Sequence, residues 1–82
     1  MIIQRIRSLY AEGKIHEGVT VAKNHIRDDL PNDETQYVIL LLAKGLHAGG
    51  FIADALYWIR QTNADPIVRI PLEEKLERLM MC

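Results

Sequence analysis

The sequence contains a single cysteine, Cys82, and a single serine, Ser8, among its 82 residues. One cysteine allows neither an internal disulfide nor a cysteine-based metal framework. The three histidines, His16, His25 and His47, are not spaced as metal ligands. Ser8 lies in a helical run without a convincing base to activate it. We therefore expect no enzymatic activity, no cofactor and no bound metal.

Neither sign of charge is in excess, because 10 basic and 11 acidic residues give a net charge of −1. The chain thus has no basic field to hold nucleic acid by counterion release. Its longest apolar run, Val38 to Ala43, is much shorter than the roughly 20 residues that span a bilayer. The N-terminal residues lack the long apolar core of a signal peptide. The expected setting is the cytoplasm, without nucleic acid or membrane insertion.

Apolar residues make up 49% of the chain, as in a globular protein, and they recur at helical spacing. The spacing predicts one all-α domain over residues 1–82. The expected helices are 2–12, 16–29, 34–48, 52–62 and a last helix from Pro71. Gly13 is a natural C-terminal stop, since glycine tolerates positive φ. Pro31 should end the second helix, and Asn32 or Asp33 should cap the third.

Two segments are harder to interpret. The third helix is apolar on every side from Tyr37 to Leu42, so it must be covered on most sides. Four short neighbours are not expected to cover it, which would leave an exposed apolar patch for a partner. Residues Ile67 to Ile70 are β-branched or charged and lie between two prolines. They predict an extended connector or a lone strand.

Several side chains could serve either structure or binding. Tyr10, Tyr57 and Trp58 would suit an interface, because aromatic residues are enriched at binding hot spots. They would equally fill the core between helices. The acidic pairs Asp28-Asp29 and Glu73-Glu74 point in different directions on a helix, which indicates solvated charges and not a catalytic pair.

A short phrase occurs twice, at residues 11–18 and 48–56, each time between two helical runs. Gly13 and Gly50 are 37 residues apart, and Pro31 and Pro66 are 35 apart. This spacing resembles the period of tetratricopeptide repeats. In the second repeat, Gly50 falls at the turn, Ala55 at the small residue between helices, and four positions pack inward: Ile39, Leu42, Ala43 and Leu46. The resemblance implies stacked antiparallel helical hairpins, about two repeats and a C-terminal helix.

Glu17-Gly18 and the stretch from Gly50 to Leu56 also resemble motifs of the small tetratricopeptide-like chaperones of type III secretion needle subunits. Members of that family wrap the C-terminal amphipathic helix of the needle subunit together with a second small helical chaperone. They keep the subunit unpolymerised in the bacterial cytoplasm. The resemblance therefore implies a protein-binding chaperone that works in a hetero-oligomer.

In tetratricopeptide repeats the first helix of each repeat lines the concave side. On that mapping the partner-binding residues of this chain are Ile3, Arg7, Tyr10, Tyr37, Leu40, Lys44 and His47. The alternative is a small homodimeric all-α regulatory or adaptor protein, which would bury the third helix against its own copy.

Overall fold

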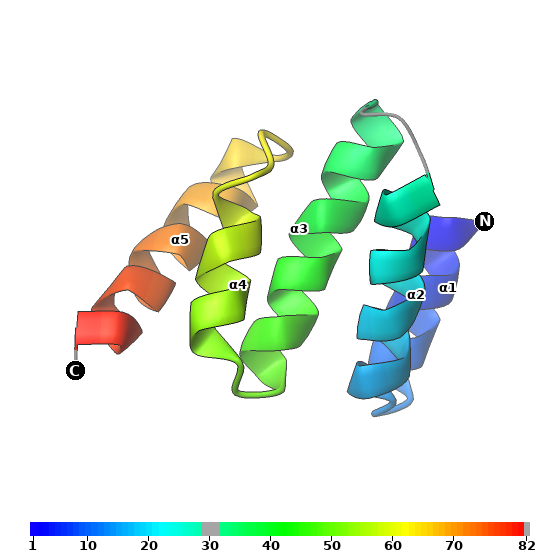
Figure 1. Cartoon of the computed structure of the whole chain (residues 1–82), viewed down its shortest axis with the longest axis horizontal. Coiled ribbons are helices and arrows are strands. Elements are labelled where there is room, and N and C mark those ends of the chain that lie inside the picture. The colour runs from blue at the N-terminus through cyan, green and yellow to red at the C-terminus, as the bar shows by residue number, and fades with distance from the viewer. Residues whose placement is uncertain (29–31, 82) are drawn as a thin grey trace.

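A computed structural model describes residues 1–28 and 32–81, and these residues form helices joined by short connections (Figure 1). The helices are α1 (Ile2–Ala11), α2 (Ile15–Asp28), α3 (Asp33–Ala48), α4 (Ile52–Ile59) and α5 (Pro66–Met81). No strand occurs in the described part of the chain, so the prediction of an all-α protein is confirmed. The molecule measures 36 × 27 × 21 Å. The helix stop expected at Pro31 lies outside the described residues.

The turns between helices follow the local signals of the sequence. Gly13 and Gly50 adopt φ angles of +82° and +86°, a region that side chains other than glycine rarely enter. A Cβ atom at either position would meet nothing within 4 Å. Glycine is therefore required by the backbone conformation and not by space. At the start of α3, Asn32 is the residue that caps the helix, because its Oδ1 accepts a hydrogen bond from the Thr35 amide at 2.8 Å.

The core is centred on α3, which contacts α1, α2 and α4. The stretch from Val38 to Ala43 is 0–7% exposed at every position. The expectation that this helix would leave a large apolar patch uncovered is therefore wrong. Ridges of helices on several sides cover it, and Leu76 of α5 belongs to the same buried cluster. A homodimer that buries the stretch from Val38 to Ala43 against its own copy is therefore not supported, because these residues are already covered within one chain.

Residues Ile67 to Ile70 form neither a strand nor a connector, since they lie in the first turns of α5. Pro66 is the first helical residue, a position where no backbone N–H is needed. The carbonyl oxygen of Asp65 accepts hydrogen bonds from the amides of Val68 at 3.0 Å and Arg69 at 2.8 Å. The helix then continues through Pro71, so the second proline does not mark its start.

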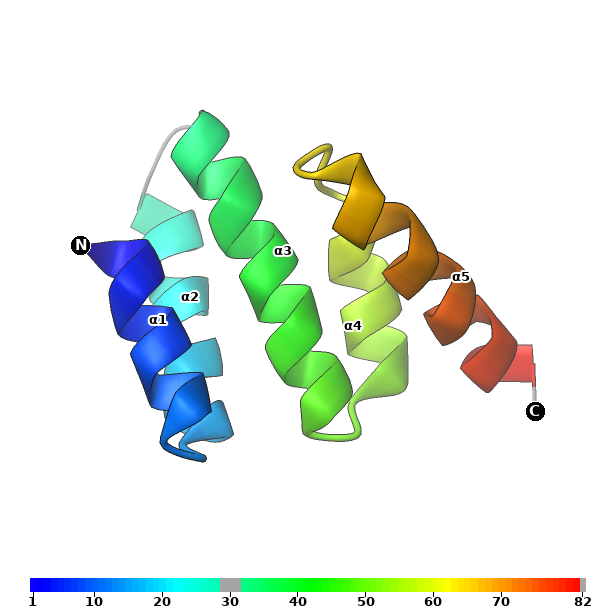
Figure 2. The ribbon, with the colours of Figure 1, turned by 180° about the vertical axis from the view of Figure 1, so that it is seen from behind.

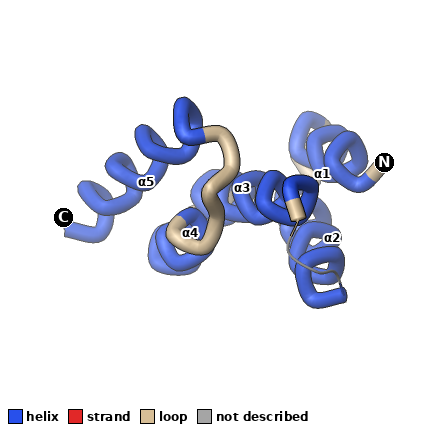
Figure 3. Tube along the Cα trace, turned by 90° about the horizontal axis from the view of Figure 1, so that it is seen from above, coloured by secondary structure: helices blue, strands red, loops and turns tan. Residues whose placement is uncertain are grey.

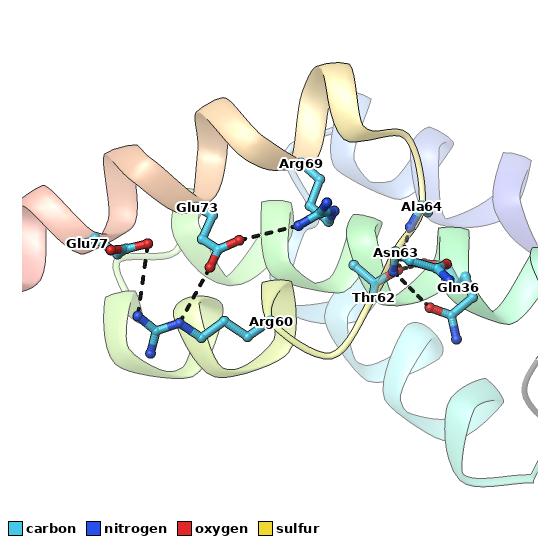
Figure 4. A network of polar contacts seen from close by, with 8 residues as sticks. All are labelled: Gln36, Arg60, Thr62, Asn63, Ala64, Arg69, Glu73 and Glu77. Atoms are coloured by element: carbon cyan, nitrogen blue, oxygen red, sulfur yellow. Dashed lines mark hydrogen bonds and ion pairs between the residues drawn. The ribbon is translucent and has the colours of Figure 1, made fainter.

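The fourth helix ends at Ile59, earlier than the sequence pattern predicts, and the chain after it is tied to α3 (Figure 4). The Thr62 hydroxyl donates a hydrogen bond to the carbonyl oxygen of Gln36 at 2.6 Å. The Asn63 amide donates to the side-chain oxygen of Gln36 at 3.1 Å. Because buried backbone groups outside a helix need such partners, these bonds stabilise the connector and fix where α5 begins.

Glu73 is not the solvated charge that the sequence suggests. Its carboxylate lies 3.6 Å from Arg60 of α4 and 3.4 Å from Arg69 of α5, while Arg60 also approaches Glu77 at 4.0 Å (Figure 4). The side chain of Glu73 is only 25% exposed. Arg60 is 13 positions and Arg69 is 4 positions before Glu73 in the sequence. Arg60 reaches Glu73 because α5 packs on α4.

Candidate functional site

The helices are arranged in two rows on either side of the molecule. Seen from above, α1 and α5 lie on one side of α3, whereas α2 and α4 lie on the other (Figure 3). The view from behind presents α1, α3 and α5 together (Figure 2). We call the side of α3 on which α1 and α5 lie the inner face.

A surface pocket of about 340 Å³ opens between α1 and α3. We call it the α1–α3 pocket. Its lining residues come from α1, the start of α2 and the second half of α3: Arg7, Tyr10, Ile15, Leu41, Lys44, Gly45 and Ala48. The surface inside it is largely apolar, and Arg7 and Lys44 are the charged residues among those that line it. An apolar hollow with a few polar groups is the usual form of a recognition site.

Tyr10 builds the wall of this pocket and fixes the distance between helices. Its hydroxyl donates a hydrogen bond to the carbonyl oxygen of Leu41 at 2.8 Å, which joins α1 to α3. The ring lies against two glycines: a Cβ atom on Gly18 would come within 2.7 Å of its Cδ1, and one on Gly45 within 2.6 Å of its Cζ. Burial raises the pKa of the Tyr10 hydroxyl to about 12, so this group stays protonated and donates at neutral pH.

Two cations accompany the pocket. The guanidinium of Arg7 lies over the ring of Tyr37, 5.2 Å from its centre, and donates a hydrogen bond to the Tyr37 hydroxyl. This stacking holds an exposed arginine in one orientation. The second cation, Lys44, lies on α3 and is exposed. In the part of the chain that the structure describes, neither Arg7 nor Lys44 pairs with a carboxylate.

Four of the seven residues proposed from the sequence lie together on the inner face. Arg7, Tyr10 and Lys44 line the pocket, and Tyr37 contacts Arg7. Ile3 is half-buried and packs against the core.

The other two behave differently. His47 is half-buried in the last turn of α3 and does not line the pocket. Leu40 is only 1% exposed and belongs to the core, so it does not line a surface groove. It shares a buried cluster with Leu76 of α5, a helix whose docking the repeat pattern does not predict.

Sequence reasoning missed several residues of the pocket, above all Gly45. This glycine lies inside an apolar helix, in its last turns but before the Gly49-Gly50 turn, and a glycine in such a place can signal a close approach of another element. Ile15, Leu41 and Ala48 gave no comparable signal. Their role depends on the packing of α1 against α3, which connects positions about 30 residues apart.

The aromatic residues of α4 face the opposite side of the molecule. Trp58 is half-buried and packs against the core, and its ring meets that of exposed Tyr57 edge to face at 5.3 Å. Both line a shallow hollow between α2 and α4, together with Lys23 and Asp54 among others. Trp58 is therefore partly a core residue and partly a surface one.

The remaining classes of site find no support in the described residues. No three potential metal-ligating side chains come together within 1–28 and 32–81. In the same ranges, no helix has both the length and the apolar character to cross a membrane. No protein-family model, curated protein or solved structure matches the chain.

Proposed function

We propose that this chain is a protein-binding domain whose inner face holds an amphipathic helix of another protein. The observation that carries the proposal is the α1–α3 pocket, an apolar hollow bordered by two cations on the side where α1 and α5 lie. A helix placed in such a site inserts side chains from one stripe into the hollow. Each large aliphatic side chain buried there contributes roughly 1.5–3 kcal/mol.

We propose that the hairpins are stacked as in tetratricopeptide repeats, and the burial of the positions expected to pack inward supports this arrangement. The positions expected to pack inward, Ile39, Leu42, Ala43 and Leu46, are all buried. Gly18 and Ala55 stand at buried positions where a small residue is expected between helices. In this arrangement α1 and α3 are the first helices of the two repeats, and α5 takes the place of the next first helix.

The resemblance of its motifs makes the proposal more specific. We propose that the partner is the C-terminal amphipathic helix of a type III secretion needle subunit, bound in the bacterial cytoplasm together with a second small helical chaperone. Covering the apolar stripe of that helix prevents premature polymerisation, because the stripe is then no longer available to other subunits.

A homodimeric adaptor is the second candidate, and one observation favours it. On α5, Ile67 is 85% exposed and Met81 is 87% exposed, although both are large and apolar. A second copy of the chain would remove such side chains from water. This dimer would form through α5 and not through α3.

Co-purification tests the two candidates directly. The chain is expressed with a needle subunit and a second chaperone from one gene cluster, and the complex is isolated through a tag on the needle subunit. Ala48→Trp fills the α1–α3 pocket from an exposed position, so we expect recovery of the complex to fall about tenfold or more. Ala53→Trp on the exposed side of α4 is the matched control and should have no effect.

Equal recovery with Ala48→Trp and Ala53→Trp would place the partner elsewhere on the molecule. Failure of the native chain to bind any needle subunit, with a dimeric mass in solution, would instead favour the homodimeric adaptor.

A further inference from the structure

We infer that the helix bound at the inner face carries two acidic residues two turns apart, with a large aliphatic residue between them that enters the α1–α3 pocket. This inference rests on the proposed function, which requires only an amphipathic helix. It adds the charge and the spacing that the partner must have.

The spacing comes from α3. Arg7 is held at the level of Tyr37, whose ring and hydroxyl it contacts. Tyr37 and Lys44 are seven residues apart on α3, which is two turns of helix, so their side chains leave nearly the same face. Arg7 and Lys44 therefore present positive charge at two levels along the inner face. The apolar lining provided by Leu41 lies between these levels, and the lining continues past Lys44 to Gly45 and Ala48.

The acidic character expected of the partner follows from the surroundings of Arg7 and Lys44. Within the described residues neither cation has a carboxylate partner, and both are exposed in the free chain. Arg7 gives one hydrogen bond to Tyr37, which leaves most of its five N–H donors available. A bound helix would exclude water from both groups. Leaving them unpaired would then weaken the complex, whereas carboxylates at the same levels would form charge-assisted hydrogen bonds.

The two observations together define a sequence pattern. An Asp or Glu on one face of the partner helix is followed three or four residues later by Leu, Ile, Val or Met, and seven residues later by a second Asp or Glu. Residues at these spacings lie on one face of a helix. The pattern is read the same way in either direction, so it holds for both orientations of the partner along α3.

Synthetic helical peptides test the pattern with the full chain. Three peptides share one sequence and differ only at the two acidic positions, which are both Glu, both Gln or both Lys. Binding is measured by fluorescence anisotropy at low and high salt. We expect the Glu peptide to bind about tenfold or more tightly than the Gln peptide at low salt. The difference should shrink as salt screens the charges.

A charge reversal on the protein sharpens the test. Lys44→Glu changes an exposed side chain without an ion pair, so the fold should be retained. The substitution should weaken binding of the Glu peptide and strengthen binding of the Lys peptide. Lys23→Glu, on the opposite side of the molecule, is the control and should leave the order of affinities unchanged.

The outcomes separate this inference from the proposed function. Equal binding of the Glu, Gln and Lys peptides would overturn the acidic pattern but keep the inner face as a helix-binding site. No binding by any of the three would overturn both.

Discussion

Helices α3 and α5 are equally long, 16 residues each, yet they have opposite environments. In α3 the buried residues run almost without interruption from Val38 to Leu46, whereas in α5 only Leu76 is buried. α3 packs against three helices, while the substantial contacts of α5 are with α4 alone. Length and helical spacing therefore do not determine how much a helix contributes to the core. That contribution depends on how many other helices pack against it.

The two helices are also held by different interactions. α3 is stabilised by burial on several sides, whereas α5 is held by the burial of Leu76 together with polar contacts around its first half, including the Glu73 ion pairs and the hydrogen bonds of the connector at Thr62. Exposed ion pairs each contribute little to stability, with a median of about 0–1 kcal/mol. Large apolar residues of α5, such as Ile67 and Met81, remain exposed, whereas the large apolar residues of α3 from Val38 to Leu42 are buried.

The largest difference between the helices should appear when a leucine is shortened. Leu42→Ala in α3, at a position that is 0% exposed, should lower the free energy of unfolding by about 2–5 kcal/mol because it leaves a cavity. Leu79→Ala in α5, at a position that is 43% exposed, should cost about 1 kcal/mol or less. Urea denaturation measures both. Similar losses would show that α5 is as much a part of the core as α3.

A smaller effect should reveal how tightly α3 is packed on the α1 side. Gly45→Ala should lower the free energy of unfolding by about 1–3 kcal/mol, because the new Cβ overlaps the ring of Tyr10. This loss is expected although alanine intrinsically favours a helix over glycine by about 1 kcal/mol. Gly49→Ala is the control, since its Cβ would meet the exposed Phe51 ring at 3.3 Å and the Gly45 carbonyl oxygen at 3.5 Å, without overlap.

The cause of that loss can be checked with a double change. Tyr10→Leu replaces the ring by a smaller side chain. In this background Gly45→Ala should lower the free energy of unfolding much less than it does alone, so the losses from the two substitutions should not add. Strictly additive losses in thermal denaturation would mean that Tyr10 does not set the limit on residue 45.

The smallest expected effect concerns the docking of α5. Glu73→Gln removes the negative charge shared by Arg60 and Arg69 and should cost up to about 1 kcal/mol. Glu74→Gln, its exposed neighbour, should change little. Amide hydrogen exchange within α5 is the suitable measurement, because it reports local opening that the global melting temperature can hide. Equal exchange in both variants would show that burial of Leu76 alone holds α5.

Features set by neighbours in the sequence were predictable. The positive φ angles of Gly13 and Gly50, the cap at the start of α3 and the helical character of the apolar runs before Pro66 follow from residues within a few positions of one another. Ala55 was expected to be buried, and it is 0% exposed. At these places local chemistry and global packing favour the same conformation.

Features set by distant residues were not predictable in the same way. The burial of Leu40 depends on the helices that pack around α3, and the pairing of Glu73 with Arg60 depends on how α5 packs onto α4. The helical state of Ile67 to Ile70 was missed for another reason. The helix begins at Pro66, and the Asp65 carbonyl oxygen accepts hydrogen bonds from Val68 and Arg69, which outweighs the β propensity of these residues. For the pocket, Arg7, Tyr10 and Lys44 were identified, but the wall formed by Gly45 requires the Tyr10 ring to be placed first.

The Tyr10 ring has a consequence for how related sequences can differ. Positions 10, 18 and 45 share one small volume, so a larger residue at either glycine requires a smaller one at position 10. A larger residue at one of the glycines alone would overpack this volume, which favours changes at two of these positions together. We therefore expect substitutions at positions 10, 18 and 45 to be correlated among homologues, with each sequence keeping either a large ring and two glycines or a smaller side chain and fuller neighbours.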